Sequence, residues 1–216
     1  MIGIMSLGLG NVGSVENMLR VIGYETVLLP SPPEHTDSFR ALILPGVGSY
    51  DSGMRAVNQS GWGDYLRLGL SETEKAPWLM GICLGMQLLC EGSEEGNESG
   101  LGLIPGRFRK FTGSSDSASR LKVPHMGWNR VEFDTTKVPW SREIPEDSRF
   151  YFVHSYRYTA PSPEFVLGTT TYGSEFASAI GRDRVVGFQF HPEKSHRFGK
   201  ALFRALFEHI HADGND

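Results

Sequence analysis

The chain has 216 residues, of which 39% are hydrophobic and 21% charged, with a formal net charge of −4. This charge balance lacks the excess of basic residues that is typical of nucleic-acid-binding proteins. No apolar run approaches the ~18 residues of a membrane span. The first residues, 1–5, lack the basic region of a signal peptide, and we interpret them as a strand.

Strand-like and helix-like segments alternate through the first half. Residues 2–5 predict a strand, and apolar runs at 26–29 and 41–44 end at prolines, which is typical of buried parallel strands. Between the first two strands, apolar residues recur at helical spacing, at Val12, Val15, Leu19 and Ile22. Another apolar run, 77–80, leads into a second helix start. This order predicts an α/β fold with a doubly wound, mostly parallel sheet flanked by helices, and ligands at the carboxyl ends of its strands.

The second half is richer in predicted strands, which span 150–153, 165–171, 176–180 and 185–190. A closing helix begins near Ser195, a plausible N-cap, and repeats apolar residues at Phe198, Leu202, Leu206 and Ile210. Two segments predict loops: 92–100 is acidic and solvated, and 112–119 is rich in serine and mobile. Because no repeat or linker divides the chain, we expect a single domain, residues 1–216.

The segment Gly81-Ile82-Cys83-Leu84-Gly85 joins the apolar run at 77–80 to a helix start. This layout is typical of a nucleophile elbow, here with cysteine at its centre. Glycines two residues before and two after the nucleophile let strand and helix backbones approach closely. At the helix N-terminus, free N–H groups and the helix dipole favour a thiolate. The alternative is a buried structural thiol in a turn tightened by glycines.

The other cysteine, Cys90, follows two helical turns after Cys83, and we expect it to face the core as a small hydrophobe. No C-x-x-C pair and no metal-ligand spacing is present, so we predict neither a metal site nor a cofactor. A reducing, cytoplasmic setting is the simpler expectation.

His191 and Glu193 follow the predicted strand at 185–190. They are two positions apart, so an extended segment projects both from the same side, and Pro192 favours extended angles at His191. Glu193 can then hold one imidazole nitrogen while the other faces Cys83. The alternative is a strand-end turn with a surface glutamate, but the elbow cysteine favours a Cys-His-Glu triad.

Two glycine-rich turns follow strands in the first half. Val47 and Gly48 follow the strand at 41–44 and could supply N–H groups to an oxyanion hole, although an ordinary βα loop fits equally well. Residues 8–13 fit the dinucleotide-binding pattern G-x-G-x-x-G, but the acidic residue expected after the second strand is missing. We therefore predict a tight turn, and keep a nucleotide-binding protein as the alternative from another class.

Together, the elbow and His191-Pro192-Glu193 resemble the class I, triad-type glutamine amidotransferases, a family with a flavodoxin-like fold. Further segments resemble one branch, the glutaminase subunits of imidazole glycerol phosphate synthase, namely Pro45–Gly48, Pro124–Asn129, Phe152–Tyr156 and Lys194-Ser195. Two positions depart from that branch: Ser6-Leu7 stands in place of an Asp-Tyr pair, and His196 in place of glutamine. These departures leave open a paralogue that supplies ammonia to another synthase, such as a sugar-aminating enzyme.

The resemblance implies hydrolysis of L-glutamine to glutamate and ammonia by Cys83, His191 and Glu193. It implies an oxyanion hole formed by the N–H of Leu84 and one N–H from Val47 or Gly48. The implied glutamine contacts are Gly48, Gln87, His154, Ser155 and Tyr156. The ammonia would pass to a (β/α)₈-barrel cyclase in a heterodimer, docked around Asn11, Met126, Trp128 and Lys194. A cysteine hydrolase of the same fold acting on another amide is a further alternative, against which the glutamine-pocket matches argue.

Overall fold

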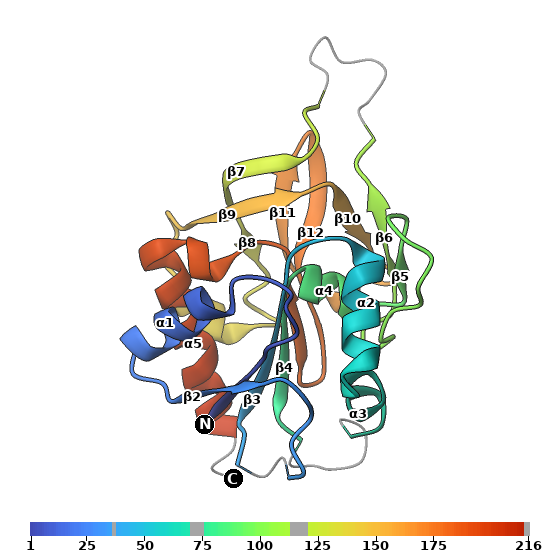
Figure 1. Ribbon diagram of the computed structural model, residues 1–216. Helices are drawn as coiled ribbons and strands as arrows, with labels where there is room; N and C mark the ends of the chain where they lie inside the picture. Colours follow the sequence, from blue (N-terminus) through green and yellow to red (C-terminus); the bar gives the residue numbers. More distant parts are fainter. Residues whose placement is uncertain (36–37, 70–75, 113–120, 214–216) are drawn as a thin grey trace.

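Five parallel strands form the centre of the fold, in the order β2-β1-β3-β4-β13. They are β1 (Ile2–Met5), β2 (Thr26–Leu29), β3 (Ala41–Gly46), β4 (Trp78–Cys83) and β13 (Val185–Phe188). The computed structural model describes residues 1–35, 38–69, 76–112 and 121–213, so most of the predicted serine-rich loop lies outside the described residues (Figure 1). The prediction of buried strands holds for β3 and β4. It is wrong for β2, where Leu28 is exposed, because β2 is the edge strand.

Helices cover both faces of this sheet (Figure 1). α1 (Val12–Val21) and α5 (His196–Asp213) pack on one face, and α2 (Tyr50–Gln59), α3 (Trp62–Gly69) and α4 (Leu84–Leu89) pack on the other. Along β3, Ala41 and Ile43 join the core under α1 and α5, whereas Leu42 and Leu44 join the opposite core. Successive side chains of a strand point to opposite faces, so one apolar run supplies both cores.

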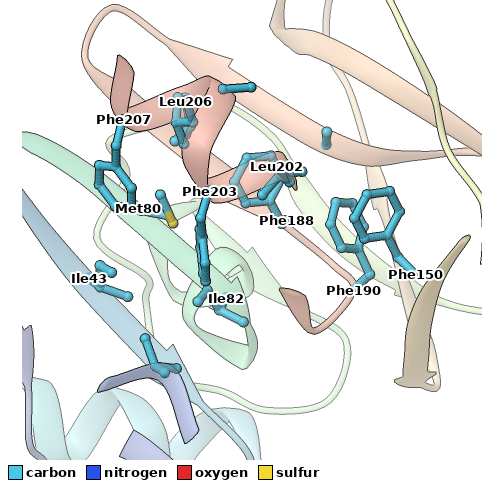
Figure 2. Packing of buried hydrophobic residues seen from close by; sticks show 14 of the residues in the cluster. Ile43, Met80, Ile82, Phe150, Phe188, Phe190, Leu202, Phe203, Leu206 and Phe207 are labelled. Carbon is cyan, nitrogen blue, oxygen red and sulfur yellow. The ribbon is translucent and has the colours of Figure 1, made fainter. Parts of the chain in front are cut away.

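The larger of these cores lies between the sheet and α5. Figure 2 shows Leu202, Phe203 and Leu206 of α5 packed over sheet residues that include Met80 and Phe188. This arrangement confirms the amphipathic closing helix. No helix in the described part of the chain is both long and apolar enough to cross a membrane.

Beyond β13 the sheet continues with strands that pair mostly antiparallel, and most of them come from the second half, in agreement with its richer predicted strand content. Next to β13 lie β12 (Ser174–Arg182), β10 (Tyr156–Thr159), β6 (Arg107–Lys110) and β5 (Gly92–Ser93), with β11 (Val166–Tyr172) and β8 (Glu132–Phe133) paired beside β12. β7 (His125–Arg130) and β9 (Arg149–His154) form a separate antiparallel pair. Three short 3-10 helices are η1 (Pro139–Glu143), η2 (Pro163–Phe165) and η3 (Pro192–Lys194).

Two sequence predictions need correction here. β13 ends at Phe188, not at Phe190, because the chain then turns to form a bridge with Tyr151. The segment 92–100 is not a solvated loop at its start, because Gly92 and Ser93 are buried in β5, which pairs with β6. This pairing carries the following residues toward the carboxyl ends of the parallel strands.

Candidate active site

Cys83 makes the turn from β4 into α4 with φ 55° and ψ −109°. A positive φ is uncommon for a residue with a side chain, and the close packing of two glycines accompanies it here. A Cβ at Gly81 would lie 2.7 Å from the Gly85 backbone, and a Cβ at Gly85 would collide with the carbonyl of Leu44. The strand and helix therefore approach each other as an elbow requires, and the thiol stands at the start of α4.

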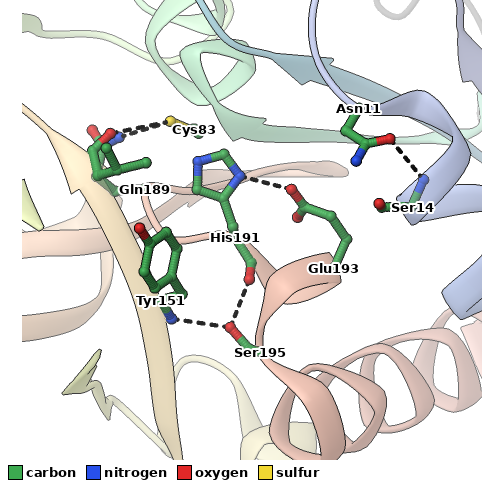
Figure 3. A network of polar contacts seen from close by, with 9 residues as sticks. Asn11, Ser14, Cys83, Tyr151, Gln189, His191, Glu193 and Ser195 are labelled. Carbon is green, nitrogen blue, oxygen red and sulfur yellow. Dashed lines mark hydrogen bonds and ion pairs between the residues drawn. The ribbon is translucent and has the colours of Figure 1, made fainter. Parts of the chain in front are cut away.

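His191 and Glu193 lie beside this thiol because β13 and β4 are parallel neighbours. The His191 Nδ1 atom is 2.7 Å from Glu193 Oε1, and the ring lies between the Cys83 sulfur and the Glu193 carboxylate (Figure 3). His191 itself is extended, as predicted, but the segment after it is not: Pro192–Lys194 form the 3-10 helix η3. The N–H of Lys194 donates to the His191 carbonyl at 3.2 Å, which curls the chain and brings the carboxylate back to the ring.

The electrostatics of His191 favour its charged form. Burial opposes the charge, but the contacts with Cys83 and Glu193 outweigh it and raise the pKa of His191 to about 9. The imidazolium form therefore prevails at neutral pH. Nε2 is buried on the Cys83 side of the ring, and no described residue gives it a hydrogen bond of regular geometry.

Ser195 fixes the backbone of this histidine. Its hydroxyl donates to the His191 carbonyl at 2.6 Å and accepts from the Tyr151 N–H at 3.0 Å (Figure 3). α5 begins directly after Ser195, as predicted: the Ser195 carbonyl accepts from the N–H groups of Phe198 and Gly199, while the hydroxyl links the His191 backbone to β9.

Gln189 is a site residue that the sequence analysis missed. It is fully buried, its Nε2 donates to Cys83 Sγ at 3.8 Å, and its Oε1 accepts from Gln87 Nε2 at 3.3 Å. One signal could have found it: Gln189 is the polar residue in the apolar run that precedes the predicted triad histidine.

A cavity of about 300 Å³ opens beside Cys83 and His191. It brings together the residues expected at an oxyanion hole or on glutamine, namely Val47, Gly48, Leu84, Gln87, His154, Ser155 and Tyr156. Two wider grooves elsewhere contain none of these residues. Glu95 also lines the cavity, from an exposed turn as predicted, and partial desolvation raises its pKa. The cavity therefore combines a nucleophile, a histidine and a carboxylate.

Val47 and Gly48 connect β3 to α2 at the edge of this cavity. The preceding Gly46 pairs with Cys83 across β3 and β4, and Gly48 has φ 109°. Backbone N–H groups from this turn and from Leu84 are thus near the thiol, and which of them would bind an oxyanion stays a prediction.

The residues expected to face a partner lie around the same end of the sheet. Met126 and Trp128 are 61% and 45% exposed, and the Trp128 ring stacks on His196 with centroids 5.6 Å apart. Lys194 Nζ lies 6.0 Å from the centre of the Tyr151 ring. Asn11 is the N-cap of α1, whose helix packs against η3. Exposed apolar groups therefore lie near His191.

The glycine turn at 8–13 has a packing explanation. Gly8 and Gly10 have positive φ angles of 71° and 94°, and a Cβ at Gly10 would lie 3.4 Å from the Gly46 backbone. The turn thus reaches the strand end beside Cys83, and its positive φ angles account for Gly8 and Gly10 without a nucleotide.

Comparison with known proteins gives concordant matches. The family model "Glutamine amidotransferase class-I" matches residues 5–210. "Imidazole glycerol phosphate synthase subunit HisH 2" of Methanococcus maripaludis is 47% identical over 202 residues, which cover 94% of this chain and 96% of the relative. The protein of the same name from Pseudomonas aeruginosa is 44% identical over 208 residues, covering 96% and 99%. A solved structure described as "Crystal structure of glutamine amidotransferase" has a TM-score of 0.73 at 18% identity, covering 97% and 98%, which shows a shared fold.

Proposed function

Because this chain belongs to the class-I glutamine amidotransferase family, we propose that it is the glutaminase subunit of an imidazole glycerol phosphate synthase. It would hydrolyse L-glutamine and pass the ammonia to a cyclase subunit, acting as a single domain over residues 1–216 in the cytoplasm. The observation that carries this proposal is the cavity beside Cys83, in which Cys83 and His191 meet the residues expected to bind glutamine.

The triad supports a two-step acyl transfer. The Cys83 thiolate attacks the amide carbon of glutamine, and the C–N bond breaks as the protonated His191 gives its Nε2 proton to the departing ammonia. The neutral His191 then takes a proton from water, which cleaves the thioester and releases glutamate. Glu193 orients the ring through Nδ1. The N–H of Leu84 and one N–H from Val47 or Gly48 would stabilise the oxyanion, and losing one such donor costs ~3 kcal/mol of barrier.

The cavity wall suits the α-ammonium group and the polar side chain of an amino acid such as glutamine. The Glu95 carboxylate can pair with the α-ammonium group of glutamine. Gln87 Oε1 is buried and has no hydrogen-bond partner in the described part of the chain, so it can accept a hydrogen bond from the substrate. Glu95 therefore joins Gln87 and the Ser155–Tyr156 segment as a proposed substrate contact.

We expect Glu95→Gln to raise KM for glutamine about tenfold or more and to change kcat little, because a charge-assisted hydrogen bond to the substrate is lost while the triad is intact. Glutamate release measured over a range of glutamine concentrations checks this. Glu94→Gln is the matched control, since Glu94 bonds to the Lys110 N–H and does not line the cavity. A Glu95→Gln variant with wild-type KM would remove Glu95 from the binding site.

A partner over the cavity is chemically sensible. Ammonia released into water at neutral pH is mostly protonated and no longer nucleophilic, so an acceptor enzyme must receive it before it escapes. We propose that a (β/α)₈-barrel cyclase docks on Asn11, Met126, Trp128 and Lys194, in a heterodimer. The exposed Met126 and Trp128 support this, because methionine and aromatic residues are enriched in interfaces.

Trp128→Ala should weaken the binding of the cyclase about tenfold or more, because exposed tryptophans at interfaces are frequent hot spots. Calorimetric titration of each variant with the cyclase gives the Kd. Leu68→Ala on α3 is the control, since Leu68 is 64% exposed and α3 lies far from β7 (Figure 1). An unchanged Kd for Trp128→Ala would place the interface elsewhere.

The test of the function is glutamate release by the purified chain, alone and with the cyclase subunit from the same organism. Strong activation by the cyclase is the expected result. If glutamate release is unchanged when the cyclase is added, the glutaminase activity stands, but the chain serves another acceptor enzyme. Absence of hydrolysis under both conditions would overturn the proposal.

A second candidate is a paralogue that supplies ammonia to a different synthase, such as a sugar-aminating enzyme. The observation that favours it is His196, which departs from the family pattern and stacks on Trp128 within the proposed docking surface. Two of the relatives also carry the number 2 in their names. Activation of glutamine hydrolysis by a second synthase, and not by the cyclase, would decide for this candidate.

A further inference from the structure

A line of hydrogen bonds links side chains of β7 and β9 and ends at the wall of the cavity. Asn129 Nδ2 lies 3.4 Å from His125 Nε2, and His125 Nδ1 lies 3.0 Å from His154 Nε2. His154 Nδ1 in turn lies 2.7 Å from the carbonyl oxygen of Tyr156. The β7–β9 register places His125 directly opposite His154, which makes this contact possible.

The chemistry of the end groups fixes the direction of every bond. The Tyr156 carbonyl can only accept, so His154 Nδ1 must carry a hydrogen. In neutral His154 the other nitrogen, Nε2, is then an acceptor, and His125 Nδ1 must donate to it. His125 Nε2 is left as the acceptor for Asn129, whose amide also donates to the Thr171 carbonyl at 2.9 Å.

Both rings are neutral in this setting. Burial lowers the pKa of His125 to about 4. Burial also lowers the pKa of His154 to about 3, an effect that the bond to Tyr156 opposes in part. A single set of tautomers therefore satisfies the whole line.

Aromatic side chains hold the two histidines in place. The His125 ring is stacked on Tyr172 at 4.0 Å and on Phe152 at 4.7 Å, measured between ring centroids. The His154 ring packs on Phe111 and Phe176 at 5.2 and 5.3 Å. Because the surroundings are apolar, a broken bond would leave a buried nitrogen unpaired, which is costly.

We propose that His125 is a positioning residue for glutamine binding, which donates to His154 Nε2 and thereby holds the His154 ring, with its Nδ1–H on the Tyr156 carbonyl, and the Ser155–Tyr156 wall of the cavity in place. The effect on glutamine rests on the proposed function, whereas the tautomer does not. His125 does not line the cavity, so it acts through His154 and not by touching the substrate.

The tautomer is tested first on the wild-type chain, by NMR of imidazole ¹⁵N shifts with the His154 signals assigned from a His154→Gln variant. Free imidazole side chains prefer the Nε2–H form, so an Nδ1–H form at His154 is a specific signature. We expect that form at pH 7. An Nε2–H form, or a doubly protonated ring, would overturn the proposal, and this measurement stands even if the chain does not hydrolyse glutamine.

The second test is His125→Phe, which keeps an aromatic ring between Tyr172 and Phe152 but removes the donor. We expect KM for glutamine to rise about tenfold, equivalent to the loss of one hydrogen bond, with a smaller change in kcat. We also expect the ¹⁵N shift of His154 Nε2 to change, because this nitrogen loses its donor while Nδ1 keeps its hydrogen on the Tyr156 carbonyl. Tyr172→Phe is the control, since it keeps the stacking and should leave both readouts unchanged. A folded His125→Phe variant with wild-type KM and an unchanged His154 Nε2 shift would contradict the positioning role. If His125→Phe does not fold, the Nε2 shift of the wild-type chain decides, since a His154 Nε2 without a donor would contradict the bond from His125.

Discussion

Cys83→Ala should abolish glutamine hydrolysis, with a fall in kcat of roughly 10⁶-fold, because removal of the nucleophile leaves only binding and the oxyanion donors. The fold should stay intact, since alanine fills the same elbow position and Cys83 forms no disulfide. Glutamate release, followed to long times at high enzyme concentration, gives the residual rate.

Cys90→Ala is the matched control for this experiment. Cys90 is the other buried free cysteine, and it lies on the helix that Cys83 begins, with its Sγ 3.8 Å from the Met86 carbonyl. We expect it to lose some stability and to keep its activity per folded molecule. Equal losses in both variants would mean that the effect at Cys83 is structural, and substantial hydrolysis by Cys83→Ala would refute the nucleophile assignment.

The central sheet could be predicted from the sequence because buried parallel strands have continuous apolar runs. β3 and β4 follow this rule, and the two-sided core around them explains it. The helices α2 and α3 were not predicted, since their apolar faces are narrow and glycine and serine interrupt them. The edge position of β2 also depends on strand order, which no local pattern specifies.

The proposed triad could be located from sequence because its members carry local signals, the elbow glycines and the His-Pro-Glu spacing. Glu95 had no such signal: an acidic segment predicts a solvated loop, and only the pairing of β5 with β6 brings it to the cavity. The contact between His125 and His154 could not be predicted from the sequence either, because it depends on a strand register that pairs residues 29 positions apart. Properties that arise from long-range register are therefore the ones that the sequence alone could not supply.

Gly85→Ala should destabilise the protein by about 4 kcal/mol or more, a large part of the total stability of a typical domain. The added Cβ would collide with the Leu44 carbonyl, which is backbone in the middle of the sheet and cannot rotate away. α4 would have to move off β3, and Cys83 would lose its position. Urea unfolding followed by circular dichroism measures the change, and insolubility of the variant is the extreme form of the same result.

Gly13→Ala separates this collision from the general effect of replacing a glycine. Gly13 lies in α1, and the atom nearest to an added Cβ is Asn11 Oδ1 at 3.8 Å, an ordinary van der Waals distance. Alanine should stabilise that helix by about 0.5–1 kcal/mol, since glycine loses more backbone freedom on folding. A Gly85→Ala variant as stable as wild type would mean that strand and helix are not in backbone contact at the elbow, and the geometry that presents Cys83 to the cavity would have to be abandoned.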